Sequence, residues 1–431
     1  MVSPAKLPAV SGGGVRALWQ GAPWSDLTFD GGTLLGVGET AGAQLAEVHA
    51  ISAATGKPRW TVTMSKSLPT VLGLVPAGNV VVVEAGHSNE NSVAGEPIAT
   101  EYVALDIKTG RTRWTAPIGG AYQSPPAAVS GKYLLTGDTS DAVTGRIAAT
   151  GAVAWRDPRP AACGPPFSAI TPGVGLAADG SLAGASFFCG RRVFVWRLNP
   201  ATGKVLWIWR SPSLAPGSAQ YLKLTSAASD GGLLLLNGDI APPSAGQQFT
   251  GALPNPHPWP TALGPVGEGA VLALAASDGH PMWSELGGQQ EDFTLTDGAV
   301  CEMVQVGLEC RGDATGAVTA PTLLNGRGQG ATPPYAGDGF AGVSDGLAAV
   351  IQAPDRPSSV LFRVLRVRTG ATVTQVRIAV SSHSYDGSNY QVFVVGAAPL
   401  GAHAILVLLR RIDVPGFPVL ALAVTVPDGV G

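Results

Sequence analysis

The stretch TGRTRW at residues 109–114 recurs along the chain with the same spacing. In each copy a Thr or Asp precedes a Gly, and a Trp follows that Gly four residues later. Five copies are complete, at Thr55-Gly56 with Trp60, Thr109-Gly110 with Trp114, Thr150-Gly151 with Trp155, Thr202-Gly203 with Trp207 and Asp278-Gly279 with Trp283. Two later copies, Thr315-Gly316 and Thr369-Gly370, lack the Trp. A motif that returns at domain-repeat spacing indicates a repeat architecture.

Each copy of the motif follows an apolar segment of strand length, such as VFVWRLN at 193–199. A tight connection between strands needs a residue with positive φ, which Gly supplies, so the pattern predicts a β-hairpin. The Trp falls on the second strand, where its large ring can fill the gap between neighbouring sheets. We therefore predict a structural, blade-docking role for Trp60, Trp114, Trp155, Trp207 and Trp283, and for Gly56, Gly110, Gly151, Gly203 and Gly279.

A second pair of predicted strands lies upstream of each hairpin, as in AAVSGKYLLTGD at 127–138. Each unit then contains four antiparallel strands. Such small sheets cannot bury both faces alone, and stacking them radially gives a β-propeller. The sequence therefore predicts an all-β fold in which residues 1–431 form a single propeller domain.

Material at both chain ends bears on the number of blades. Seven hairpin motifs are followed by three more predicted strands, and the N-terminal segment VRALWQG at 15–21 carries Trp19 in the same strand context. We expect eight blades, the last one closed by the N-terminal strand, with Trp19 as a further docking residue. A seven-bladed ring with additional strands at its ends is the alternative. Residues 1–14 are expected to be a flexible lead-in.

Composition excludes some classes of function. The net charge is −3 and charged residues make up 13% of the chain, with no basic block of the kind that nucleic-acid binding requires. The longest apolar runs have strand length, so we expect no membrane span within this chain. The first residues contain no apolar signal-peptide core, and we expect an anchor or export signal upstream. We also expect a monomer.

Four cysteines bear on the cellular compartment. Cys301 and Cys310 flank a predicted hairpin, which would place them opposite each other at disulfide distance. Cys163 and Cys189 form a second predicted pair in loop-like sequence. Disulfides persist in oxidising compartments, so the pairs predict an extracytoplasmic protein, periplasmic, secreted or anchored at the cell surface. Four separate buried thiols are the alternative.

The segment YVALDIKTGRTRW at 102–114, with its relatives at 48–60, 195–207 and 271–283, resembles the PQQ-like repeat family. The resemblance implies a propeller whose blades are locked by the Trp. Family members include dehydrogenases that carry pyrroloquinoline quinone and calcium, BamB-type scaffold proteins, and extracytoplasmic sensor domains. The dehydrogenases carry an adjacent Cys pair over the cofactor, and this sequence has no neighbouring cysteines. The resemblance therefore implies a non-catalytic member without cofactor, metal or catalytic residues.

We accordingly expect a scaffold that binds a protein or a cell-envelope component. The alternatives are a small-ligand sensor domain of a membrane-anchored protein and a PQQ-dependent dehydrogenase. The insertion at 240–266, in blade five, presents His257 and Trp259 between prolines and is the predicted partner-binding loop. A loop that merely covers blade edges is the alternative there. A second polar stretch, EAGHSNENSVAGEP at 84–97, is expected to be a solvent-exposed loop.

Overall fold

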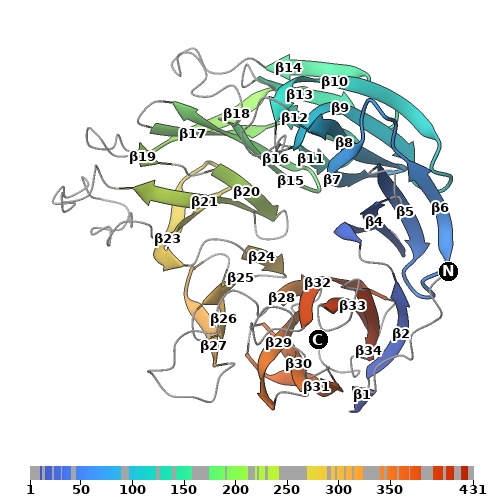
Figure 1. Ribbon diagram of the computed structural model, residues 1–431. Helices are drawn as coiled ribbons and strands as arrows, with labels where there is room; N and C mark the ends of the chain where they lie inside the picture. The colour runs from blue at the N-terminus through green and yellow to red at the C-terminus, as the bar shows by residue number, and fades with distance from the viewer. Residues whose placement is uncertain are drawn as a thin grey trace.

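The strands of this computed structural model are arranged around a common centre (Figure 1). The structure describes residues 10–11, 15–21, 24–30, 32–39, 45–88, 97–122, 127–137, 142–157, 174–189, 192–211, 219–220, 223–228, 232–241, 269–288, 293–296, 299–304, 307–312, 315–323, 340–343, 347–356, 359–367, 369–379, 392–400, 404–411 and 419–425. Over these residues all regular structure is β-strand, and every pair of neighbouring strands is antiparallel.

The strands of the described residues form eight sheets, which we number in chain order. Sheets 1 to 4 consist of β3 (Ser25–Asp30), β4 (Thr33–Glu39), β5 (Ala46–Ser52) and β6 (Pro58–Thr63); β7 (Thr70–Ala77), β8 (Val80–Ser88), β9 (Pro97–Asp106) and β10 (Thr112–Tyr122); β11 (Ala127–Ser130), β12 (Tyr133–Gly137), β13 (Val143–Ile147) and β14 (Val153–Asp157); and β15 (Val174–Asp179), β16 (Leu182–Cys189), β17 (Arg192–Leu198) and β18 (Val205–Arg210).

Sheets 5 to 8 follow the same order of strands with two additions. They consist of β20 (Lys223–Ala228), β21 (Leu233–Ala241), β22 (Gly269–Ala275) and β23 (Pro281–Gly288); β24 (Phe293–Thr296), β25 (Ala299–Val304), β26 (Gly307–Gly312) and β27 (Val318–Leu323); β28 (Phe340–Val343), β29 (Leu347–Arg356), β30 (Ser359–Arg366) and β31 (Thr372–Ala379); and β32 (Val392–Pro399), β33 (Ala404–Arg411), β34 (Val419–Thr425) and β2 (Val15–Gly21). The additions are β19 (Ala219–Gln220), which pairs with β21, and β1 (Val10–Ser11), which pairs with β31.

The first strands of successive sheets contact one another all the way round. The contacts run from β3 to β7, β11, β15, β20, β24, β28 and β32, and β32 in turn contacts β3. Strand β2, near the N-terminus, pairs with β34, the last described strand, from Val15 opposite Val424 to Gly21 opposite Val419, so sheet 8 combines strands from the first and last parts of the chain. Within the expected lead-in of residues 1–14, only Val10 and Ser11 are described, and they form β1.

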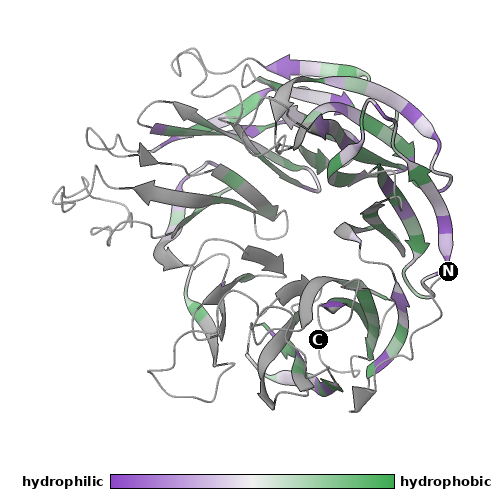
Figure 2. Ribbon diagram, viewed as in Figure 1, coloured by the Kyte–Doolittle hydropathy of each residue, from purple (hydrophilic) through white to green (hydrophobic). Residues whose placement is uncertain are grey.

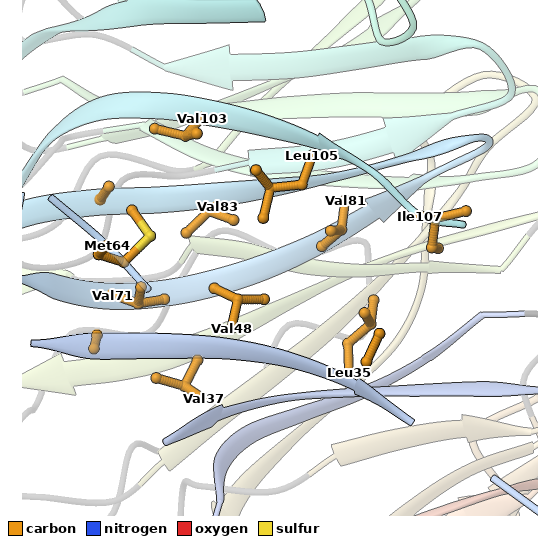
Figure 3. Close-up of a cluster of buried hydrophobic side chains, with 13 residues drawn as sticks. Leu35, Val37, Val48, Met64, Val71, Val81, Val83, Val103, Leu105 and Ile107 are labelled. Atoms are coloured by element: carbon orange, nitrogen blue, oxygen red, sulfur yellow. The ribbon is translucent and has the colours of Figure 1, made fainter. Parts of the chain in front are cut away.

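The core consists of layers of aliphatic side chains between neighbouring sheets. Between sheets 1 and 2, Leu35 and Val48 meet Val81, Val83 and Leu105 (Figure 3), and all five side chains are fully buried. Burying an aliphatic side chain of this size contributes about 1.5–3 kcal/mol, so each layer strongly favours stacked over separate sheets. Hydrophilic residues are conspicuous on outer strands such as β6 and β14, whereas the coloured parts of β33 and β34 are mostly hydrophobic (Figure 2).

Candidate interaction surface

The hairpin turns between the third and fourth strands share one geometry. Gly110 has a φ of 72° and its N–H donates to the carbonyl of Asp106 at 2.8 Å. A side-chain oxygen of Asp106 also accepts from the N–H of Thr109 at 2.9 Å. The Asp106 cap is not shared by every copy, but the left-handed Gly is, and the Thr hydroxyl repeatedly accepts from the N–H two residues on, as Thr109 does from Arg111 and Thr150 from Ala152. These two features explain why the sequence repeats Thr-Gly at this point.

Five of the docking Trp residues lie against the turn of the following sheet and donate their indole N–H there. The acceptors are the carbonyl oxygens of Ala53 for Trp19 (2.8 Å), Ile107 for Trp60 (2.9 Å), Ala148 for Trp114 (2.7 Å), Pro200 for Trp155 (2.8 Å) and Ala276 for Trp207 (2.9 Å). Every acceptor is the first residue of a hairpin turn. Trp19 makes this contact from sheet 8 to sheet 1, as the other four do between sheets nearer the middle of the chain.

The glycines of the turns leave room for these rings. A Cβ placed on the turn Gly would lie within 3 Å of the indole in the pairs Gly56 with Trp19, Gly110 with Trp60, Gly151 with Trp114, Gly203 with Trp155, Gly279 with Trp207 and Gly316 with Trp283. Real Cβ atoms do not approach other heavy atoms so closely, so the Gly is required twice, for its φ and for its missing side chain. The repeated residues therefore position the sheets, and we look for functional residues in other parts of the chain.

The turns of these sheets lie on one side of the ring, which we call the turn side. In sheet 2, Val80 pairs with Asp106 beside the turns, whereas Ser88 pairs with Pro97 at the other end of the same strands. In sheet 5 the corresponding far pair is Asp239 with Gly269. The connections between second and third strands in both sheets therefore leave from the opposite side, which we call the loop side.

The polar stretch at 84–97 is only partly a loop, which corrects the expectation from sequence. Strand β8 continues through Ser88, and Glu84 lies within it opposite Tyr102, with 5% of its surface exposed. His87 is exposed at the end of that strand. The insertion is therefore shorter than expected, because an acidic residue that the sequence assigns to solvent lies in the interior of a strand.

The predicted partner-binding residues of the long insertion cannot be placed. Strand β21 extends to Ala241 and β22 begins at Gly269, while His257 and Trp259 lie outside the described residues. Of the cysteines, Cys301 and Cys310 form a disulfide across the directly opposed positions of β25 and β26, with their Cα atoms 4.1 Å apart. Cys163 and the side chain of Cys189 also lie outside the described set.

Two clusters of titratable groups lie close to the turns and strands of sheets 1 and 2. The Arg113 guanidinium and the Thr109 hydroxyl hydrogen-bond to Asp106 and lower the pKa of its carboxyl from 3.8 to about 2. In sheet 1, burial lowers the pKa of His49, although the nearby Glu47 carboxylate raises it. Asp106 and Arg113 join β9 to β10, whereas His49 and Glu47 lie on the same strand and His49 reaches β6 through Thr61. Both clusters therefore stabilise a single sheet.

The described residues include no group of three or more His, Cys, Asp or Glu side chains placed to hold a metal ion. In the same part of the chain, no helix has the length and apolar character needed to cross a membrane.

Comparison with known proteins identifies the repeat. A family model described as outer membrane protein assembly factor BamB matches residues 12–165 and 99–285, which together span more than half of the chain. The chain belongs to this BamB-like family of PQQ-like repeat β-propellers. Among curated proteins, none matches this sequence.

Solved structures with low sequence identity share the fold of this BamB-like chain. BamB from Moraxella catarrhalis is 14% identical, with a TM-score of 0.51, and the match covers 96% of this chain and 99% of that one. The computationally designed Ika8 protein is 13% identical (TM-score 0.52; 93% and 96% covered). The C-terminal WD40 domain of Sif2 is 10% identical (TM-score 0.53; 98% and 100% covered). WD40 repeats build propellers, so these likenesses agree on the fold.

Proposed function

We propose that this BamB-like chain is a non-catalytic, extracytoplasmic scaffold that binds a protein or a cell-envelope component. The observation that carries the proposal is the family match to an outer membrane protein assembly factor over residues 12–285. The full-length likeness to a BamB structure supports the fold on which such a role would rest.

The architecture supports binding by a rigid surface. Indole rings fix the turn of one sheet to the outer strand of the previous one, so the sheets do not need to be ordered when a partner arrives. Binding to a preorganised surface loses little conformational entropy. We propose that His257 and Trp259 of the long insertion contact the partner.

We also propose that the eight sheets are the blades of one closed eight-bladed ring. The pairing of β2 with β34 and the contact of β32 with β3 support this count. Trp19 supports it as well, because its contact with the turn at Ala53 joins sheet 8 to sheet 1. We further propose that the ring is monomeric and that an anchor or export signal precedes it.

An extracytoplasmic location is supported by the Cys301–Cys310 disulfide, since such bonds are rare in reducing compartments. Non-reducing peptide mapping of the protein isolated from its native cells tests this assignment. We expect a linked peptide pair that contains both cysteines. Two free thiols in that material would contradict the location.

The scaffold role is tested by in-cell photo-crosslinking with a photoreactive residue at 257 or 259. We expect discrete cross-linked partners, and their loss when residues 245–264 are replaced by a short Gly-Ser linker. The matched control carries the photoreactive residue at Lys132, an exposed position in the turn between β11 and β12. Turnover of an alcohol or sugar with pyrroloquinoline quinone, calcium and an acceptor dye would overturn the non-catalytic assignment.

A further inference from the structure

The outer strand of sheet 4 exposes an unusual pair of apolar side chains. Leu206 and Ile208 in β18 each have 47% of their surface exposed. Only two other large hydrophobic residues in the described part of the chain, Val153 and Val318, are exposed to a similar extent, and they lie on different strands. Leu206 and Ile208 are separated by one residue, and we call this exposed pair the apolar row.

The row flanks a Trp that packs into the core shared by sheets 4 and 5. Trp207 and Trp209 pack against the buried cluster between those two sheets. The pairing of β17 with β18 shifts between Trp207 and Val205, so Leu206 is the extra residue of a β-bulge, and Leu206 and Ile208 are exposed on either side of Trp207. Arg210, at the end of the same strand, is exposed and places its guanidinium 5.4 Å from the centre of the Phe194 ring.

The corresponding strands of sheets 1 and 2 carry polar side chains at these positions. Counted from the docking Trp, Leu206 corresponds to Arg59 in β6 and Ile208 corresponds to Thr61, and all four residues are exposed. In β10 the matching residues are Arg113 and Thr115. Charged residues at sheet edges prevent unwanted strand pairing, and β18 lacks that protection between its two ends.

The backbone of β18 has a sheet partner on one side. Sheet 4 has the order β15-β16-β17-β18, which leaves β18 as its edge in the described residues. The same edge of sheet 7 takes an additional strand from this chain, since β1 pairs with β31 at Val10 opposite Ile378 and Ser11 opposite Arg377. The fourth strand of a sheet in this ring therefore accepts a fifth strand.

Charge indicates the chemistry of the occupant. Lys204 and Arg210 are exposed at the two ends of the apolar row, and the segment between them contains no carboxylate. The two cations lie six residues apart, Lys204 in the turn before β18 and Arg210 at the end of that strand. A complementary strand would carry carboxylates at that separation and two apolar side chains between them.

We propose that β18 is a docking edge for an extended segment of a partner protein, in which two alternate apolar residues are bracketed by acidic residues. The segment adds to sheet 4 as a further antiparallel strand, so that main-chain hydrogen bonds give affinity and the side-chain row gives selectivity. This inference rests on the proposed scaffold function and adds a second contact surface, on the rim of the ring.

The test uses the full chain and a labelled peptide, Glu-Thr-Ile-Thr-Val-Thr-Glu, followed by fluorescence anisotropy. Leu206→Arg with Ile208→Thr installs the side chains of β6 at the same positions, and we expect at least tenfold weaker binding. The matched control, Val153→Thr, removes an exposed apolar side chain from β14 and should leave binding unchanged. A peptide of the same composition with its apolar residues adjacent should bind at least tenfold more weakly than the alternating one.

A charge exchange provides a second test that does not alter the apolar row. Lys204→Glu with Arg210→Glu should lose the acidic peptide and prefer one with Lys at both ends. Equal binding of the acidic peptide to wild type and either double variant would overturn the proposal. A concentration-dependent dimer in sedimentation velocity that Leu206→Arg with Ile208→Thr abolishes would overturn it too, because a second copy would then occupy β18.

Failure of this proposal and failure of the scaffold role give different results. If cross-links from residue 257 persist while the peptide fails to bind, the scaffold role stands and the β18 site falls. If quinone-dependent turnover is found, the non-catalytic role falls, and the peptide measurement still decides the β18 site.

Discussion

The contact between a turn glycine and the docking Trp of the previous sheet allows a quantitative prediction within sheet 3. Two of its glycines have positive φ, Gly131 at 57° and Gly151 at 71°. A Cβ at Gly131 would have no heavy atom within 4 Å, whereas a Cβ at Gly151 would lie 2.6 Å from Cδ2 of Trp114. Substituting Ala at each position therefore separates the backbone cost from the cost of the contact.

At Gly131, Ala brings only the cost of a left-handed conformation. That cost is about 1–2 kcal/mol, and reduced freedom of the unfolded chain offsets about 0.4–1 kcal/mol of it. We expect the Gly131→Ala variant to lose about 1 kcal/mol of unfolding free energy. This variant is the matched control.

At Gly151, Ala also displaces the Trp114 ring. Forcing extra volume into a packed site costs about 1–3 kcal/mol, and the 2.7 Å hydrogen bond from the indole to Ala148 contributes about 1 kcal/mol. We expect Gly151→Ala to lose about 3–5 kcal/mol in total, which is about 2–4 kcal/mol more than Gly131→Ala.

Urea denaturation followed by circular dichroism measures both losses, provided that the slope with denaturant is unchanged. In a Trp114→Ala background the clash no longer exists, so Gly151→Ala should there cost about 1 kcal/mol, as at Gly131. If Gly151→Ala costs no more than Gly131→Ala, or the same with and without Trp114, the docking role of the indole is refuted.

Three other predictions follow from a contact between sheets 3 and 4, a contact within sheet 2 and the pairing of β2 with β34. Trp155→Phe keeps an aromatic ring but loses the hydrogen bond to Pro200, so denaturation should report a loss of about 1 kcal/mol, and Trp155→Ala should lose more. Folding lowers the pKa of Asp106 from 3.8 to about 2, so its stabilisation is present above pH 4 and disappears as the pH falls to about 2. Asp106→Asn should therefore make stability less dependent on pH in that window, as measured by acid unfolding. Arg16→Cys with Ala423→Cys, at opposed positions of β2 and β34, should form a disulfide under mild oxidation and raise the denaturation midpoint, whereas a ring that leaves β2 unpaired would give free thiols.

The parts of the fold that the sequence predicts well are those with a local cause. A left-handed turn needs Gly, and a gap between sheets needs a large ring at a fixed distance from that turn. Trp19 was identifiable from the same strand context, although no Thr-Gly pair precedes it. These requirements repeat because every sheet meets its neighbour in the same geometry.

The errors concern residues whose surroundings come from distant parts of the chain. Glu84 reads as loop sequence because it is acidic and begins a polar stretch, yet the ladder with Tyr102 holds it inside sheet 2. Leu206 and Ile208 are apolar strand residues with no local sign of exposure in the sequence, yet the outer strand leaves 47% of each residue exposed. In both cases the position of the strand in the ring outweighs the chemistry of the side chain.

The absence of Trp from the last two motifs has a different meaning in each. Thr374 of sheet 7 takes the place of a docking Trp, and the next sheet has no hairpin to receive one, because its third and fourth strands come from opposite ends of the chain. Sheets 7 and 8 are instead joined by a cluster of large aliphatic side chains with Phe362.

In sheet 6, Ala320 takes the place of the docking Trp, although the next sheet has a hairpin turn at Gly370. The described cluster between sheets 6 and 7 contains no aromatic ring. It consists of Ala299, Ala348, Leu365 and Val367 together with Cys301 and Cys310. The disulfide thus cross-links a sheet at the place where the docking ring is missing, and it restricts the separation of strands that packing alone holds less strongly there.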